Sequence, residues 1–138
     1  MNWTDRYVGI RFASQGRTLA GCDCWGLVRL IYQTELGITL PEYGEISATD
    51  LVEVSKNISS GYVSEPWTAV DTATEFDVAV MRFHGSRNVG HVGVMVDSEH
   101  VVHTEKGIDA SVVPMNHMTI RHRLVCFRRH KEVSRKNE

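Results

Sequence analysis

Cys24, His91 and His103 have the side-chain types that nucleophilic catalysis requires. The thiolate is the attacking form of cysteine, and a histidine at neutral pH can take the thiol proton and later protonate a leaving amine. A third polar group then fixes the tautomer and the orientation of that histidine. One cysteine with two histidines therefore indicates a nucleophile, a base and an orienting residue, if the fold brings them together.

The stretch around Cys24 predicts a helix over residues 23–36. Apolar side chains recur there at helical spacing, at Leu27, Leu30, Ile31 and Leu36. Asp23 is a good N-cap, since its carboxylate can accept hydrogen bonds from first-turn amides, and Gly37 is a typical helix stop. Cys24 then lies in the first turn, where the helix dipole favours negative charge and a thiol ionises more easily. The sequence thus predicts an activated thiolate.

Two strands, at residues 89–96 and 100–104, are predicted to carry the histidines. Joined by a turn at residues 97–99, they would pair antiparallel and place His91 opposite or diagonal to His103. Gly93 lies on the same strand face as His91. Because Gly93 has no side chain, we expect the helix to cross the sheet there and to bring Cys24 to His91.

The remaining pattern favours an α+β domain. Residues 2–8 and 49–59 have helical features, and residues 61–74 are expected to be irregular. Further strands are predicted at residues 76–83, 107–114 and 123–128. Helices therefore come first and an antiparallel meander follows.

Composition limits which binding partners and which cellular compartment are expected for this chain. The chain has 138 residues, 42% of them hydrophobic, and a formal net charge of −2, so neither nucleic acid nor an anionic membrane is the expected main partner. Residues 1–130 are expected to form one domain and residues 131–138 a flexible basic tail. We expect no membrane insertion, and the N-terminal residues lack a basic-then-apolar signal pattern. Synthesis in a reducing cytoplasm, without disulfides between the three cysteines, is the resulting expectation.

Three segments resemble the NlpC-type cell-wall peptidases: Asp23-Cys24-Trp25-Gly26-Leu27-Val28, His91-Val92-Gly93-Val94 and Val102-His103. The resemblance implies a papain-like fold, with the nucleophile helix packed on an antiparallel sheet, and neither metal nor cofactor. It implies Cys24 as nucleophile, His91 as general base and acid, and His103 as orienting residue. It also implies Asp23 and Trp25 as oxyanion or substrate-binding residues, with the Cys24 amide as an oxyanion donor. The expected reaction is hydrolysis of peptidoglycan stem peptides between the γ-carboxyl of D-glutamate and a diamino acid.

The local pattern is similar to the branch of this family found in phage and prophage tail tips. The matching segments are Gly16-Arg17, residues 36–44 and Arg123-Leu124-Val125-Cys126-Phe127-Arg128-Arg129-His130. This similarity implies a virion tail component with other tail proteins as partners, made in the bacterial cytoplasm and acting on the cell wall.

Two positions depart from the common family pattern. Many members have serine where this chain has Trp25, whereas members of the phage branch share the tryptophan. Many also have a tyrosine about twelve residues before the cysteine, where this chain has Phe12 and so lacks a hydroxyl donor. Phe12 therefore weakens the expected oxyanion site on that side.

Other interpretations compete with catalysis. Cys24 could be a small buried hydrophobe, and Glu105 could take the orienting role in place of His103. Cys22 and Cys24 with both histidines would also make a four-ligand zinc set, although Cys-x-Cys is tighter than the usual spacing. At the level of function, the alternatives are a catalytically vestigial tail-assembly or binding protein and an acyltransferase that uses the same three residues on lipids.

Overall fold

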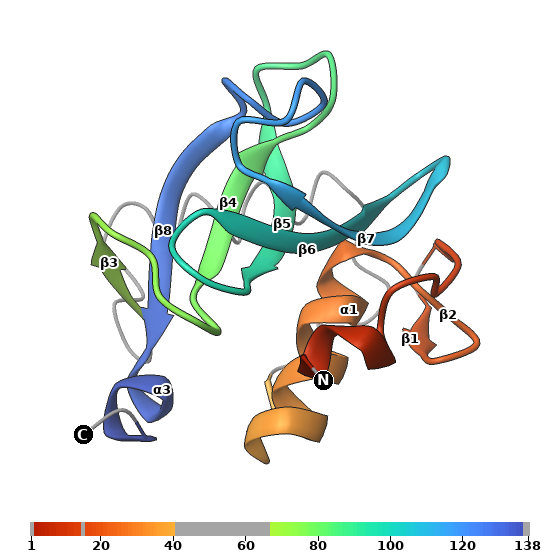
Figure 1. Ribbon diagram of the computed structural model, residues 1–138. Helices are drawn as coiled ribbons and strands as arrows, with labels where there is room; N and C mark the ends of the chain where they lie inside the picture. Colours follow the sequence, from red (N-terminus) through yellow and green to blue (C-terminus); the bar gives the residue numbers. More distant parts are fainter. Residues whose placement is uncertain (1, 15, 41–66, 137–138) are drawn as a thin grey trace.

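Figure 1 shows the computed structural model, which describes residues 2–14, 16–40 and 67–136. The helix expected at residues 49–59 lies outside the described residues. The N-terminal elements gather on one side of a six-stranded sheet, and the C-terminal helix lies at the end of the last strand. This is the expected α+β arrangement, with one helix packed on an antiparallel sheet.

The sheet has the strand order β3-β8-β4-β5-β6-β7, and each neighbouring pair is antiparallel. The strands are β3 (Trp67–Val70), β4 (Val78–Arg82), β5 (Val89–Met95), β6 (His100–Glu105), β7 (Ile108–Pro114) and β8 (Leu124–His130). The last five confirm the predicted strands. β3 was missed, because it is short and follows Pro66 in a segment expected to be irregular. Among the described residues, it lies at the edge of the sheet and pairs with β8 alone.

The N-terminal part confirms two predicted helices and adds a hairpin. A 3-10 helix covers Trp3–Arg6, and its N-cap Asn2 accepts a hydrogen bond from the Thr4 amide. α1 (Cys24–Ile31) continues into a π-helical turn, Tyr32–Leu36, which ends at Gly37 with φ +68°. The positive φ is the left-handed conformation expected of a glycine stop. β1 (Arg17–Thr18) and β2 (Gly21–Cys22) pair where only a loop was predicted.

Both faces of the sheet are covered, which explains why β4 and β5 are apolar on both sides. The main core joins α1 to one face and includes Leu27, Val28, Ile31, Val78, Val80, Val92, Val94 and Val102. A second cluster on alternate positions contains Ala79, Met81, Met95, Val101 and Ile120. Strand alternation separates the two sets. α1 is thus fixed against β5, the strand that carries His91.

The C-terminal segment differs from the expected flexible tail. Lys131–Lys136 form the helix α3, and Val133 is buried in the main core. Before it, Arg129 forms a two-point ion pair with the fully buried Asp77, at 2.9 and 2.8 Å. The basic run therefore contributes to the folded domain through residue 133 at least. Within the described residues, no helix is long and apolar enough to cross a membrane.

Candidate active site

The start of α1 holds Cys24 in a fixed position. The Asp23 carboxylate accepts a hydrogen bond from the Gly26 amide at 2.7 Å, which confirms Asp23 as the N-cap. A Cβ atom on Gly26 would lie 2.1 Å from the carbonyl oxygen of Gly16. The glycine thus allows the loop before β1 to press on the first turn. Cap and loop together set where the Cys24 side chain points.

The Cys24 thiol lies against the backbone on both sides of His91. It donates a long hydrogen bond to the Gly90 carbonyl, with the sulfur 3.9 Å from the oxygen. The backbone amides of Val92 and Trp25 interact favourably with the thiolate form. The structure therefore brings the predicted nucleophile to the strand of the predicted base.

Burial opposes ionisation of this thiol. Cys24 is 7% exposed, and burial raises the pKa of its thiol to about 12. The amides of Val92 and Trp25 lower the pKa by less than burial raises it. The predicted lowering of the thiol pKa is therefore wrong for this state. The position at the helix start is as expected, but the loss of water outweighs its effect.

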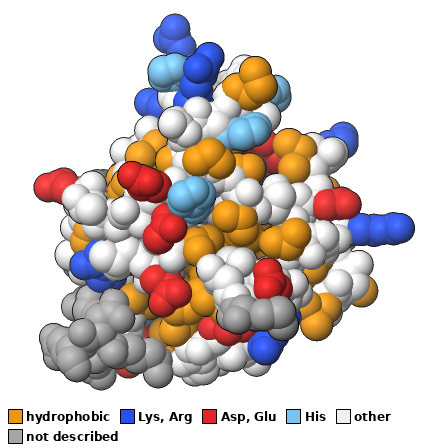
Figure 2. All heavy atoms as spheres, viewed as in Figure 1, with side chains coloured by type: hydrophobic (Ala, Val, Ile, Leu, Met, Phe, Trp, Pro, Cys, Tyr) orange, Lys and Arg blue, Asp and Glu red, His pale blue; other side chains and the backbone are white. Residues whose placement is uncertain are grey.

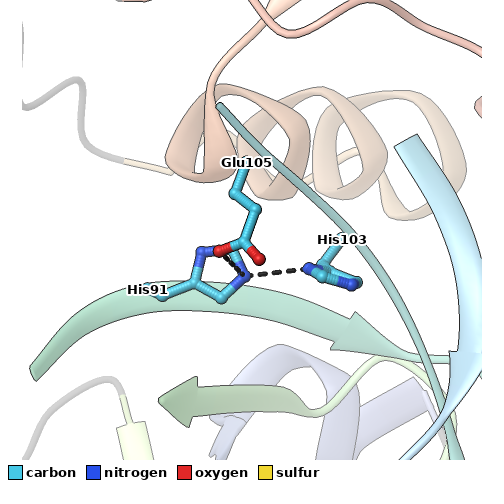
Figure 3. A group of neighbouring side chains, drawn as sticks. All are labelled: His91, His103 and Glu105. Carbon is cyan, nitrogen blue, oxygen red and sulfur yellow. Dashed lines mark hydrogen bonds and ion pairs between the residues drawn. The ribbon is translucent and has the colours of Figure 1, made fainter. Parts of the chain in front are cut away.

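His91 and His103 form a buried pair (Figure 3). Nε2 of His91 lies 2.9 Å from Nδ1 of His103. β5 and β6 pair Val94 with Val102, and continuing this register places His103 opposite Gly93, diagonal to His91. Of the two placements predicted, opposite or diagonal, the structure shows the diagonal one.

Gly93 has a different neighbour from the one expected. A Cβ atom there would lie 2.6 Å from Cγ2 of Val101 and 3.1 Å from Cβ of His103. Its closest neighbours are therefore on β6, not on the helix. Gly93 lets the side chain of His103 come close to β5.

Both imidazoles are neutral near neutral pH. Burial lowers the pKa of His91 to about 3, and the Glu105 carboxylate opposes this effect. Burial also lowers the pKa of His103. The contacts of His91 with His103 and Glu105 both involve Nε2. These contacts leave Nδ1 as the ring nitrogen of His91 that does not face His103 or Glu105.

Glu105 and Arg123 complete the polar cluster. Oε2 of Glu105 lies 3.8 Å from Nε2 of His91. Arg123 donates to both carboxylate oxygens of Glu105, at 3.0 and 2.8 Å. Sequence reasoning treated Glu105 only as a substitute for His103 and gave Arg123 no role. The available signal was the His-x-Glu spacing, which returns to the same face of a strand.

The zinc set of Cys22, Cys24, His91 and His103 is not assembled. Among the described residues, the group whose ligand atoms lie within 4.8 Å of one another is His91, His103 and Glu105. Both carboxylate oxygens of this group accept hydrogen bonds from Arg123, and the two rings contact each other. The guanidinium charge beside the carboxylate also opposes a bound cation. The donors therefore fit a hydrogen-bonded cluster better than a metal site.

The other predicted site residues lie close to α1. Trp25 is 6% exposed and belongs to the main core, and Asp23 acts as helix cap, so their oxyanion or substrate roles stay predictions. Phe12 forms an isolated bridge with Cys22, which places it beside the strand that leads to Cys24. The side chain that lacks the tyrosine hydroxyl therefore lies near the start of α1.

Solved structures with this fold include three NlpC/P60 proteins. The NlpC/p60 domain of the peptidoglycan hydrolase SagA has a TM-score of 0.57 at 17% identity, covering 90% of each chain. An NlpC/P60 family protein from Bacillus cereus ATCC 10987 has a TM-score of 0.64 at 21% sequence identity. A lipoprotein-like NLP/P60 protein from Staphylococcus aureus subsp. aureus Mu50 has a TM-score of 0.61 at 19% sequence identity.

For the Bacillus and Staphylococcus proteins, the match covers 90% of this chain but only 36% and 37% of theirs. At these identities, the similarity establishes the fold. A search of curated proteins finds no significant match.

The family comparison covers most of the chain. Residues 9–129 match the NlpC/P60 family, a span that includes Cys24, both histidines, Glu105 and Arg123. This family includes cysteine peptidases that hydrolyse peptidoglycan, and the architecture above is its papain-like fold. The chain therefore belongs to the NlpC/P60 family.

Proposed function

We propose that this protein is a cysteine peptidase that hydrolyses amide bonds in peptidoglycan stem peptides, between γ-D-glutamate and a diamino acid. The observation that supports it is the placement of Cys24 at the start of α1, against the backbone flanking His91, whose ring contacts His103. Family membership supports the reaction class. The bond follows from the resemblance of the sequence motifs.

The proposed reaction needs two proton transfers through His91. Nδ1 of His91 takes the thiol proton as the Cys24 sulfur attacks the amide carbonyl, and the Cys24 amide donates to the oxyanion. The imidazolium then protonates the leaving amine and leaves a thioester. Water, deprotonated by His91, hydrolyses the thioester, which releases the acid and restores the thiol. Because both groups are neutral beforehand, proton transfer accompanies attack.

The first test is digestion of purified peptidoglycan by the wild type and by Cys24→Ala, with products identified by mass spectrometry. We expect new stem-peptide fragments from the wild type alone. His91→Ala should abolish them too, while His103→Ala should leave weak activity, since an orienting residue assists without being indispensable. Full activity of His91→Ala would contradict the mechanism.

We further propose that the protein acts as part of a phage or prophage tail, where it helps to open the cell wall. The support is the similarity of the segments around residues 16–28, 36–44 and 123–130 to tail-tip members. Its partners would then be other tail proteins. Mass spectrometry of purified virions should find the chain in the tail fraction, and its consistent absence there would contradict this assignment.

A catalytically vestigial assembly or binding protein is the second candidate function. The buried Cys24, with its raised pKa, is the observation that favours it. This function predicts no peptidoglycan products from the wild type under reducing conditions at any pH. It also predicts that Cys24→Ala supports tail assembly as well as the wild type does.

A further inference from the structure

We propose that Glu105, clamped by Arg123, is a positioning residue that holds His91 in the tautomer able to accept the thiol proton. The kinetic consequence rests on the proposed function, whereas the assignment itself rests on geometry. Glu105 and His103 both approach Nε2 of His91 (Figure 3). The protonation of this nitrogen determines what Nδ1 can do.

The contact between the two imidazoles has two possible directions. If Nε2 of His91 carries the proton, it donates to Nδ1 of His103, and Nδ1 of His91 is a base. If Nδ1 of His103 donates instead, the His91 proton lies on Nδ1, which cannot then accept one from Cys24. Two neutral imidazoles are about equally able to donate and to accept this hydrogen bond. The 2.9 Å contact between them therefore does not choose the direction.

The carboxylate of Glu105 supplies the missing asymmetry. Oε2 lies 3.8 Å from Nε2 of His91, where its negative charge attracts an N–H and repels a lone pair. It also offsets the positive charge when His91 becomes an imidazolium, which neutral His103 cannot do. In agreement, Glu105 acts to raise the pKa of both His91 and His103 against the effect of burial.

Arg123 keeps this carboxylate in place. Its side chain is 10% exposed, and it donates to both oxygens of Glu105. The guanidinium is itself held by the carbonyls of Arg82 and Thr119, at 2.9 and 3.0 Å. Because the charge of Arg123 acts to lower the pKa of both histidines, its useful contribution is mechanical. The planar two-point contact prevents the carboxylate from turning away.

The fold contains a matched control for this pair. Arg129 binds both oxygens of Asp77 at similar distances, so Asp77→Asn breaks a pair of the same kind. Asp77 precedes Val78, which pairs with Val94, whereas His91 pairs with Met81 at the other end of the ladder. Three residues along a strand correspond to about 10 Å. We therefore expect Asp77→Asn to lower the stability of the protein without changing the tautomer of His91.

The experiment compares the wild type, Glu105→Gln, Glu105→Asp and Asp77→Asn, each as the full chain labelled with 15N-histidine. Long-range 1H–15N spectra report which ring nitrogen of His91 carries the proton. We expect the Nε2–H form in the wild type, Glu105→Asp and Asp77→Asn, and a substantial Nδ1–H population in Glu105→Gln. On peptidoglycan fragments, Glu105→Gln should lower kcat about 10- to 100-fold with little change in KM.

Retention of the Nε2–H form in Glu105→Gln would overturn the inference, as would an equal fall in kcat for Asp77→Asn. If Glu105→Gln does not fold, Arg123→Lys is the second variant, and unchanged tautomer and kcat there would overturn the clamp. A wild type that cleaves no peptidoglycan contradicts the proposed function alone. The spectra still decide the tautomer assignment in that case.

Discussion

Cys24 and His91 are both shielded from water, with exposed fractions of 7% and 2%. Shielding penalises the thiolate and the imidazolium alike, so both the thiol of Cys24 and the ring of His91 are neutral in the free protein. An ion pair formed before the substrate binds is not what this geometry favours. In the proposed mechanism, Cys24 is instead activated at the moment of attack, when His91 takes its proton.

At the residue scale, we expect Cys24 to react slowly with iodoacetamide at neutral pH. Because the pKa of its thiol is raised to about 12, the reactive thiolate is scarce in the folded protein. Site-resolved mass spectrometry should show slower labelling than in the same chain unfolded in urea. Rapid labelling of folded Cys24 at slightly acidic pH would indicate a preformed thiolate and contradict this account.

His91 should make stability depend on pH. Its pKa lies near 6.5 in the unfolded chain and about 3 in the folded protein, so the unfolded chain binds a proton that the native state excludes. The free energy of unfolding should therefore fall as pH is lowered from about 6.5 toward about 3. Urea titrations of the wild type and His91→Gln provide the comparison. The variant should have a shallower slope, and identical slopes would exclude His91 as the source.

At the element scale, the start of α1 depends on one close approach. Gly26 lies in the first turn, where alanine would ordinarily favour the helix by about 1 kcal/mol. Here a Cβ atom would come 2.1 Å from the Gly16 carbonyl, which belongs to the loop before β1. Propensity and packing therefore oppose each other at this position.

Packing should prevail in Gly26→Ala, with a net loss of about 1–3 kcal/mol. Thermal unfolding measures it directly. Asp23→Asn is the matched control, because asparagine caps a helix about as well as aspartate and adds no atom to the contact. A Gly26→Ala variant as stable as the wild type would show that the loop before β1 moves aside at little cost.

At the scale of the whole molecule, two ion pairs connect β8 and its preceding turn to the rest of the sheet. Arg123 reaches Glu105 of β6, and Arg129 reaches Asp77, which lies just before β4. On the face in Figure 2, one group of Lys, Arg and His side chains lies at the end formed by the turns before β5 and β8, and acidic side chains lie across the middle. Further Lys and Arg side chains lie at the right and lower edges of this face, so charges of both signs are interspersed there.

Asp77→Asn should destabilise the fold by about 3 kcal/mol, because it leaves the partly buried Arg129 without its ionic partner. Peptidoglycan cleavage by the folded fraction should not change, since Asp77 lies at the far end of the ladder from His91. Chemical denaturation and kcat together test both halves of this expectation. A fall in kcat without a fall in stability would contradict it.

The sequence by itself determined the elements that carry the site. Asp23, Gly37 and the apolar period between them fixed the limits of the helix, because caps and periodicity are local signals. Alternation in residues 89–104 likewise determined the two strands and predicted that His91 and His103 lie opposite or diagonal to each other, and the structure shows the diagonal placement. These features depend only on residues close together in the chain.

Only the tertiary structure decided the protonation states of the site residues and the long-range contacts that hold them in place. Burial reversed the expected pKa shift of Cys24, and the neighbours of Gly93 proved to be on β6. The contact of Glu105 with Arg123 joins residues 18 positions apart, and that of Asp77 with Arg129 joins residues 52 apart. Such effects depend on how much water the completed fold excludes and on which distant side chains meet. No local pattern in the sequence contains that information.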